Sequence, residues 1–335
     1  MLKIAYHPIH QHNLPDGHRF PMEKYDLLPQ QLIYEGTCDK ENFFEPEIPN
    51  NKYFFMVHDP DYVSDLMNIT LNQKAARKIG FPLSEDLIAR EMIIADGTIK
   101  ASEFAIKYGI AMNIAGGTHH AFTNKGEGFC MLNDQAIGAR YLQEKNFANK
   151  ILIVDLDVHQ GNGNSEIFKD NRHVFTFSMH SKTNYPAKKS ISDLDVELED
   201  NLEDDAYIKT LKFYLNELNN ENFDFVFYIA GVDIHFNDRL GNLKISDEGV
   251  RQRDELVIDN FSGPDISPLT RINTSNAGYL ETQTTNQLVI KFYEDRYGNK
   301  SKTFFTEGNL TYESDTNLTI TQTTSLLNTP YFINA

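Results

Sequence analysis

The sequence predicts an α/β protein of three layers, in which a mostly parallel central sheet is covered by helices on both faces. Short apolar runs rich in Ile, Val and Phe alternate with longer segments of helical period, which is a βαβ pattern. Several runs are apolar at consecutive positions, as expected for parallel strands buried on both faces. With 335 residues, 40% of them hydrophobic, the chain can form one large domain or a domain with a small appendage.

The expected strands span residues 3–7, 53–58, 109–117, 150–159, 173–180 and 223–231. The helices between them have recognisable N-terminal signals. Asp59 can cap a helix that has Pro60 at its first position, and Ser84 precedes two acidic residues that suit the positive end of another helix. A further helix is expected over 204–220, where one apolar stripe consists of Ile208, Leu211, Leu215 and Leu218.

The composition changes near residue 260. All eleven histidines lie at or before His235, whereas residues 261–335 hold 14 Thr and 8 Asn among 75 residues. In this segment apolar and polar residues alternate around turn-forming Gly and Asn, which is typical of antiparallel hairpins. We therefore expect one domain over residues 1–260 and an atypical β-rich, hairpin-like tail of unknown role over residues 261–335.

Composition limits the compartment and the partners. The two cysteines, Cys38 and Cys130, exclude a disulfide framework and a four-thiolate zinc site. The sequence shows no secretory signal and no long apolar span, so we expect a cytoplasmic protein that does not bind membranes. A formal charge of −17 repels phosphate backbones and attracts cations, so we expect no direct nucleic-acid ligand and favour a cationic substrate.

The stretch VDLDVHQGNG, which starts at residue 154, places charged residues at the end of an apolar run. On a strand, Asp155, Asp157 and His159 would point to one face, and such a buried row requires a neutralising cation. Asp157 and His159 are suitable ligands for zinc or a similar divalent ion at the carboxyl end of a parallel strand. The alternative is a salt-bridged pair near a turn.

Two further clusters follow expected strands. In AGGTHHAF, two glycines permit a tight turn, and His119 and His120 can move protons near neutral pH, although a histidine pair is also common on surfaces and in cores. Asp233 follows the strand at 223–231 and can complete a set of three metal ligands, or it can cap a helix or turn. Three protein ligands leave a fourth position for water, which favours hydrolysis.

These motifs resemble those of the histone deacetylase superfamily, nearest to class IV enzymes and bacterial histone deacetylase-like amidohydrolases. The resemblance runs from about residue 1 to 258 and includes GGTHHAF, EGFCMLND, DLDVHQGNG, FSMH, NYP and GVDIHFNDRLGNLKIS. It implies an arginase/deacetylase fold. It also implies zinc-dependent hydrolysis of an N-acyl amine, such as acetyl-lysine in proteins or a small acetylated amine.

The resemblance also implies residue roles. The zinc ligands would be Asp157, His159 and Asp233. His120 would be the general base, oriented by Asn162, and His119 would assist it from a pair with Asp155. The walls of the acyl-lysine channel would be Gly128, Phe129 and Tyr185, although Tyr185 is equally a plain loop aromatic. Members of the family also often hold a monovalent cation such as K⁺, here near Asp155, Asp157 and Ser178.

Two departures from the family pattern are visible. Asn162 stands where many relatives have Asp, so the partner of His120 would be neutral, as it is in class IV relatives. The Gly-rich motif that ends in the oxyanion-binding tyrosine is missing, and Tyr279 in NAGYLE is a poor match. Losing one oxyanion donor typically costs about 10²- to 10³-fold in rate, so we expect weak activity and a fold weakened by a missing sheet strand.

Two alternative functions remain. A binuclear manganese ureohydrolase shares the fold by resemblance, but it would need a second Asp two residues after His159, where this chain has Gly161. A catalytically inactive acyl-lysine binding protein is favoured by the missing tyrosine motif.

Overall fold

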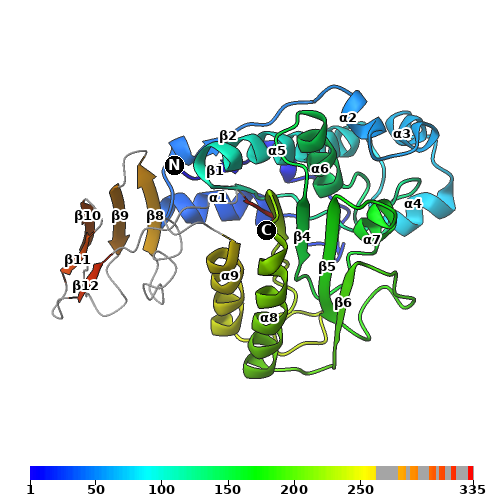
Figure 1. The fold of residues 1–335 in the computed structure, drawn as a ribbon. Helices are drawn as coiled ribbons and strands as arrows, with labels where there is room; N and C mark the ends of the chain where they lie inside the picture. Colours follow the sequence, from blue (N-terminus) through cyan, green and yellow to red (C-terminus); the bar gives the residue numbers. More distant parts are fainter. Residues whose placement is uncertain are drawn as a thin grey trace.

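The computed structural model describes residues 1–261 and, beyond them, the backbone of strands within residues 278–334. In this part of the chain, an eight-stranded parallel sheet has the order β2-β1-β3-β13-β7-β4-β5-β6 (Figure 1). Its strands are β1 (Lys3–Ala5), β2 (Phe43–Phe44), β3 (Ile110–Asn113), β4 (Ile151–Asp155), β5 (Val174–Ser181), β6 (Leu194–Leu198), β7 (Phe225–Ile229) and β13 (Tyr331–Asn334).

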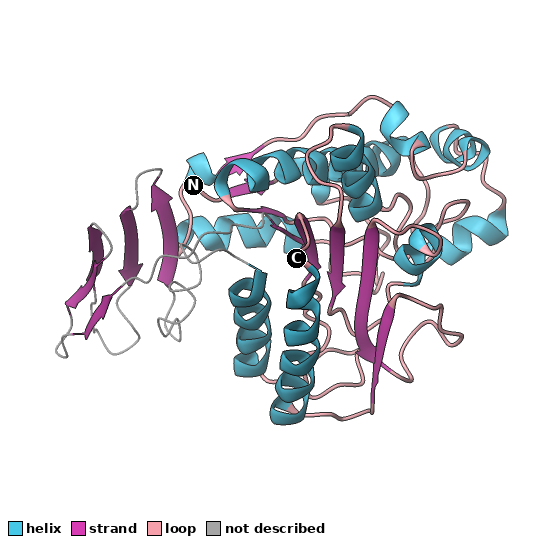
Figure 2. Ribbon diagram, viewed as in Figure 1, coloured by secondary structure: helices cyan, strands magenta, loops and turns pink. Residues whose placement is uncertain are grey.

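Helices cover both faces of this sheet, which confirms the three-layer prediction (Figure 2). Helices α8 and α9 lie together over one face, and α5 and α6 lie over the other. The α-helices in the described residues are α1 (Lys24–Tyr34), α2 (Lys52–Phe55), α3 (Pro60–Met67), α4 (Gln73–Ile79), α5 (Glu85–Tyr108), α6 (Asp134–Glu144), α7 (Asn162–Phe168), α8 (Asp204–Leu218) and α9 (Asp247–Phe261). Short 3-10 turns span Pro8–His10, Lys40–Asn42 and Asn219–Glu221.

Strand β4 is apolar from Ile151 to Val154 because each of its two faces packs in a separate core. Along β4, Ile151 and Ile153 face the core beneath α5 and α6, whereas Leu152 and Val154 face the core beneath α8 and α9. This alternation is the two-residue period of a strand. Burial on both faces therefore leaves only the ends of β4 available for polar groups.

The helix-capping predictions are confirmed. Asp59 accepts a hydrogen bond from Asp61 N before α3, with Pro60 in the first helical turn, and Ser84 accepts one from Leu87 N before α5. In α8 the predicted stripe faces the core, where Leu211, Leu215 and Leu218 are buried and Ile208 packs at the edge.

The strand expected at residues 53–58 is wrong. Lys52–Phe55 form helix α2, and His58 N donates to Phe54 O at 2.8 Å. The buried side chains are those of Phe54, Val57 and His58, spaced by three and four, whereas Phe55 is half exposed. Burial in this segment therefore follows a helical period, although its composition favours a strand.

The expected loss of a sheet strand is also wrong. The backbone of β13 pairs in parallel with both β3 and β7 and fills the place between them. A second, antiparallel sheet has the order β12-β11-β10-β9-β8, formed by β8 (Gly278–Gln283), β9 (Gln287–Phe292), β10 (Lys302–Thr306), β11 (Asn309–Glu313) and β12 (Leu318–Thr321). The domain boundary near residue 260 stays a prediction.

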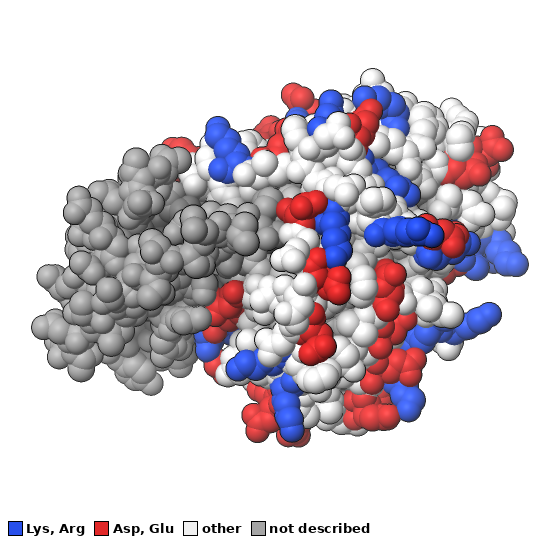
Figure 3. All heavy atoms as spheres, viewed as in Figure 1, with Lys and Arg blue, Asp and Glu red and all other residues white. Residues whose placement is uncertain are grey.

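Acidic and basic side chains share the surface drawn in Figure 3, with acidic groups prominent over the lower part of the molecule, where α8 and β6 lie. Among the described helices, none combines the length and the apolar character that crossing a membrane requires.

Candidate active site

The three predicted metal ligands meet at the carboxyl edge of the sheet. Asp157 and His159 follow β4, Asp233 follows β7, and these two strands pair directly. The side-chain ligand atoms of the three residues lie within 4.8 Å of one another. His159 Nδ1 is 2.9 Å from Asp157 Oδ1 and 3.0 Å from Asp233 Oδ2.

The expected row on one face of a strand is not formed. Strand β4 ends at Asp155, and the two ligands that follow lie in the loop before α7. Asp155 points instead to His119, whose Nδ1 is 2.7 Å from Asp155 Oδ2. Leaving the strand lets Asp157 and His159 turn toward Asp233, which a continued strand would not allow.

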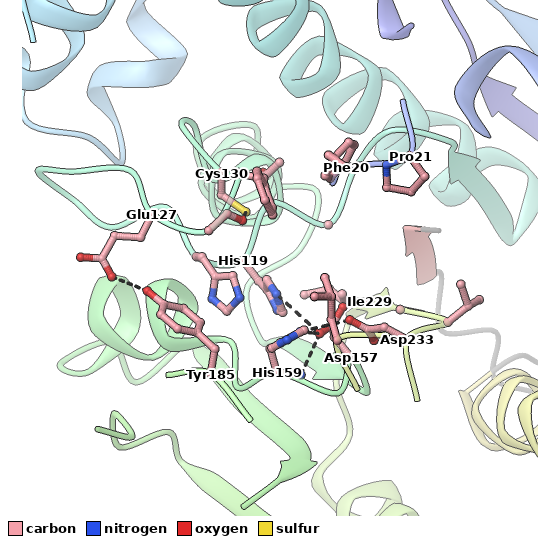
Figure 4. Close-up of a pocket in the computed structure, with 18 of the residues that line it drawn as sticks. Phe20, Pro21, His119, Glu127, Cys130, Asp157, His159, Tyr185, Ile229 and Asp233 are labelled. Atoms are coloured by element: carbon pink, nitrogen blue, oxygen red, sulfur yellow. Dashed lines mark hydrogen bonds and ion pairs between the residues drawn. The ribbon is translucent and has the colours of Figure 1, made fainter. Parts of the chain in front are cut away.

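Backbone contacts aim the two carboxylates. Val158 N donates to Asp233 Oδ1 at 3.0 Å, which leaves Oδ2 directed at His159. A Cβ added at Gly231 would lie 2.2 Å from Asp157 Oδ2, so only glycine lets the backbone after β7 approach this carboxylate. The site is thus a close-packed cradle for the acidic ligands (Figure 4).

The electrostatics of this cradle favour positive charge. Burial alone lowers the pKa of His159, but its hydrogen bonds to Asp157 and Asp233 outweigh burial and raise the pKa to about 10. Burial raises the pKa of Asp233, and the adjacent Asp157 carboxylate adds to this effect. Two carboxylates and one imidazole within reach of one point match the donors that zinc prefers, so these residues fit a divalent ion.

The histidine turn after β3 is held by Asp134, at the start of α6. Its Oδ1 accepts hydrogen bonds from Gly117 N at 3.2 Å and Thr118 N at 2.8 Å. Asp134 is fully buried, so these bonds satisfy a carboxylate that burial would otherwise penalise. The turn thereby directs His119 and His120 into the cavity.

The two histidines have different partners. Burial lowers the pKa of His119, but the carboxylates of Asp155 and Asp157 outweigh burial and raise it to about 9. His120 Nδ1 lies 2.6 Å from Asn162 Oδ1. Burial, followed by the positive fields of His119 and His159, holds the pKa of His120 well below its usual value.

A cavity of about 900 Å³ opens above these groups. The predicted wall residues Gly128, Phe129 and Tyr185 all line it. Gly128 has φ +54°, and a Cβ there would lie 2.7 Å from His120 Cδ2, so the wall touches the histidine directly. The Tyr185 ring stands edge-on to His120 with centroids 5.0 Å apart.

Glu127 is a site residue that the sequence reasoning missed. Tyr185 Oη donates to Glu127 Oε2 at 2.6 Å, and Lys78 and Lys125 approach Oε1 at 2.9 and 2.8 Å (Figure 4). Burial raises the pKa of Glu127, but bonds from Lys125, Tyr185 and Lys78 outweigh burial and lower it to about 2. The motif EGFC contains this residue, but two of its partners are distant in the sequence, Lys78 in helix α4 and Tyr185 in the loop after β5.

The described lining residues include two tyrosines, Tyr25 and Tyr185. The Tyr185 hydroxyl is engaged by Glu127, away from the ligand cluster. Tyr279 belongs to strand β8 of the antiparallel sheet, and its side chain lies outside the described residues.

The predicted monovalent-cation residues adjoin the three ligand side chains and share Asp157 with them. Ser178 pairs with Asp155 along β4 and β5, and its Oγ is 3.0 Å from His180 Nδ1. Asp155 Oδ1 accepts from Asp157 N at 3.2 Å. A K⁺ site at Asp155, Asp157 and Ser178 stays a prediction.

Comparison with known proteins identifies the family. The histone deacetylase domain matches residues 18–285, so the chain belongs to the histone deacetylase family. An uncharacterized protein of Picosynechococcus sp. is 45% identical over 256 residues, covering 76% of this chain and 85% of that protein. Histone deacetylase 2 of Arabidopsis thaliana is 28% identical over 277 residues, covering 79% of this chain and 70% of that protein. Acetoin utilization protein AcuC of Staphylococcus aureus is 27% identical over 257 residues, covering 70% of this chain and 66% of that protein.

Solved structures agree with this assignment. An HDAC homolog complexed with SAHA and an HDAC homolog from Aquifex aeolicus each have a TM-score of 0.69 and 25% identity, covering 78% of this chain and 76% of theirs. The arginase/deacetylase fold is therefore confirmed. The family and its relatives support deacetylase-type hydrolysis as the class of reaction.

Proposed function

We propose that this protein is a zinc-dependent amidohydrolase that removes acyl groups, typically acetyl, from lysine side chains or small amines. The observation that carries the proposal is the convergence of Asp157, His159 and Asp233 directly beside His119 and His120 in one cavity. A formal charge of −17 suits a cationic peptide or amine as substrate.

Asp157, His159 and Asp233 would hold the ion. A divalent ion with three protein ligands supplies Lewis acidity, which polarises an amide carbonyl and makes water more acidic. The remaining chemistry belongs to the protein side chains, which must move a proton and hold the substrate.

His120 is the general base of the proposed reaction. Because Asn162 Oδ1 can only accept, His120 Nδ1 carries the proton, and Nε2 keeps its lone pair for the cavity. His120 Nε2 takes a proton from the attacking water as its oxygen bonds to the acyl carbon. The same proton then goes to the leaving amine nitrogen as the C–N bond breaks.

Protonated His119 stands beside this base, with ring centroids 4.1 Å apart, and Asp155 holds it in place. Gly128, Phe129 and Tyr185 would form the channel, where the Phe129 ring packs against the methylene stem of a lysine. The centroid of the Phe129 ring lies 5.1 Å from that of Phe20 and 5.0 Å from that of Phe81. These ring contacts hold Phe129 in place at the side of the channel.

The second candidate function is an acyl-amine binding protein with little turnover. It is favoured because the Tyr185 hydroxyl faces Glu127 and does not point at the ligand cluster. A binuclear ureohydrolase is disfavoured, since the described residues contain one metal-ligand cluster and Gly161 occupies the position that a second site would need.

The test measures bound metal and acetate released from an acetyl-lysine peptide, for wild type and His120→Ala. Metal binding with acetate release that needs both the metal and His120 supports the hydrolase. Metal and peptide binding with no acetate release identifies the binding protein. Release of urea from a guanidino compound would reject both in favour of a ureohydrolase.

A further inference from the structure

We infer that Arg253 of helix α9 is a positioning residue that holds the two ligand-bearing segments together and thereby sets the metal affinity. The inference rests on the proposed function for the existence of the metal site. It concerns a residue that lies beneath the site and touches none of the proposed reacting groups.

Arg253 is a fully buried cation, at 0% exposure. A buried charge is costly unless its hydrogen bonds are satisfied. Its Nη1 donates to Gly231 O at 2.5 Å and Leu156 O at 3.4 Å, and its Nη2 donates to Ala230 O at 3.3 Å. Its Nε donates to Asp254 Oδ1 at 2.8 Å, which balances the charge.

The three carbonyls belong to the two segments that carry the ligands. Leu156 is the first residue after β4 and immediately precedes Asp157, and Ala230 and Gly231 lead from β7 to Asp233. A guanidinium presents its donors in a rigid planar fork, so one side chain can span both segments. Arg253 therefore fixes the separation of the strand ends from below.

This separation matters because the two segments are in direct contact at the ligands. Gly231 lies so close to Asp157 that an added Cβ would be 2.2 Å from its Oδ2. Movement of the Gly231 carbonyl away from Arg253 would change the space available to that carboxylate. The position of Arg253 is therefore transmitted to Asp157 through Gly231.

Arg253 is also held through the Asp254 carboxylate. Tyr228 Oη, from the core face of β7, donates to Asp254 Oδ1 at 2.5 Å, and the same oxygen accepts from Arg253 Nε. The Tyr228 ring is fully buried beneath α9. The arginine is thus locked to β7 by a side-chain contact as well as by backbone carbonyls.

The same helix offers a matched control. Arg251, two residues earlier, pairs with Glu248 and Glu255 on the surface of α9. Replacing Arg251 removes one cation from the same helix without touching the strand ends.

The experiment measures the Zn²⁺ dissociation constant by competition with a chromogenic chelator, on variants whose folding is checked by circular dichroism. Arg253→Met should weaken Zn²⁺ binding about 10- to 100-fold, the range typical of groups that orient metal ligands. Arg251→Met should bind Zn²⁺ as wild type does. Arg253→Lys should lie between them, because an ammonium cannot span three carbonyls.

Folded Arg253→Met with wild-type Zn²⁺ affinity would overturn the inference, as would an equal loss in Arg251→Met. If Arg253→Met does not fold, Arg253→Lys decides, and unchanged Zn²⁺ affinity in that variant overturns the inference. Failure of wild type to bind Zn²⁺ would instead reject the proposed function, so the two failures are distinguishable.

Discussion

His119 and His120 are neighbours in the chain but lie in two different electrostatic regions of the site. His119 faces the carboxylates of Asp155 and Asp157, which raise its pKa to about 9. His120 faces the neutral amide of Asn162 and the backbone of Gly128, and burial holds its pKa well below the usual value. The partner and its charge, and not the residue type, decide which imidazole is available as a base.

Replacing each histidine by alanine is the strongest way to break this comparison. We expect His120→Ala to lower kcat about 10²- to 10⁴-fold, the range for loss of a general base. His119→Ala should cost less, because His119 acts beside the base without taking the proton. Acetate release by the two variants measures the difference, and equal losses would contradict the division of roles.

Gly128→Ala tests the contact between Gly128 and His120 without changing the surroundings of His119. The added Cβ would lie 2.7 Å from His120 Cδ2, and φ is +54°, so His120 or the wall must shift. Displacement of a catalytic group by about 1 Å can cost about 10²-fold, so kcat should fall by up to that factor. Gly17→Ala is the control, because it also has positive φ but no atom within 4 Å of its added Cβ. Equal kcat in the two variants would contradict direct contact between Gly128 and His120.

Asn162→Asp sharpens the comparison by giving His120 a partner like that of His119. A carboxylate beside an imidazole raises its pKa, by about one unit or more. Because the base must be neutral, the pH at which kcat/KM rises should move upward by a similar amount. A profile that does not move would show that Asn162 does not set the protonation of His120.

His58 provides the smallest expected effect on activity, since it is buried and is not among the described residues that line the cavity. Its Nδ1 donates to Phe122 O at 2.9 Å and its Nε2 accepts from Asn133 N at 3.0 Å, so it is neutral. Burial lowers its pKa to about 4. In the unfolded chain His58 therefore binds a proton below about pH 6.5, whereas in the folded chain it stays neutral until the pH falls to about 4.

The stability contributed by neutral His58 is thus present above about pH 6.5 and is lost as the pH falls toward about 4, by up to about 3 kcal/mol. Glutamine can make both hydrogen bonds without titrating. Urea unfolding of wild type and His58→Gln should therefore diverge in pH dependence across this window, while kcat near neutral pH stays the same. Parallel pH profiles of stability would show that His58 does not titrate as described.

The sequence alone predicts that Asp157, His159 and Asp233 meet, because local order and topology agree there. Asp157, His159 and Asp233 each follow an apolar strand, and carboxyl ends of parallel strands share one sheet edge. The pairing of β4 with β7 then brings the three together. The family resemblance also predicts Asp155 as the partner of His119, although strand alternation alone would have placed Asp155 in a row with the ligands.

Contacts between distant segments could not be predicted from the sequence. Glu127 and Tyr185 are 58 residues apart, and Arg253 and Leu156 are 97 apart, with no periodic signal linking them. The position of β13 is a similar case. Strand β13 has only four residues and lies in a Thr/Asn-rich segment, so its sequence does not specify which sheet it joins. Its pairing with β3 and β7 is decided by tertiary packing.

Zinc titration of wild type, Asp233→Asn and Asp238→Asn tests the central claim most directly. The amide oxygen introduced by Asp233→Asn can still accept from Val158 N, so this variant keeps the backbone contact and loses the charge. Asp238 lines the same cavity outside the ligand cluster and accepts from backbone N–H groups that an asparagine could also serve. We predict one Zn²⁺ per chain, a more than about 100-fold loss of affinity in Asp233→Asn, and no change in Asp238→Asn. Tight binding that is unaffected by Asp233→Asn would contradict the account.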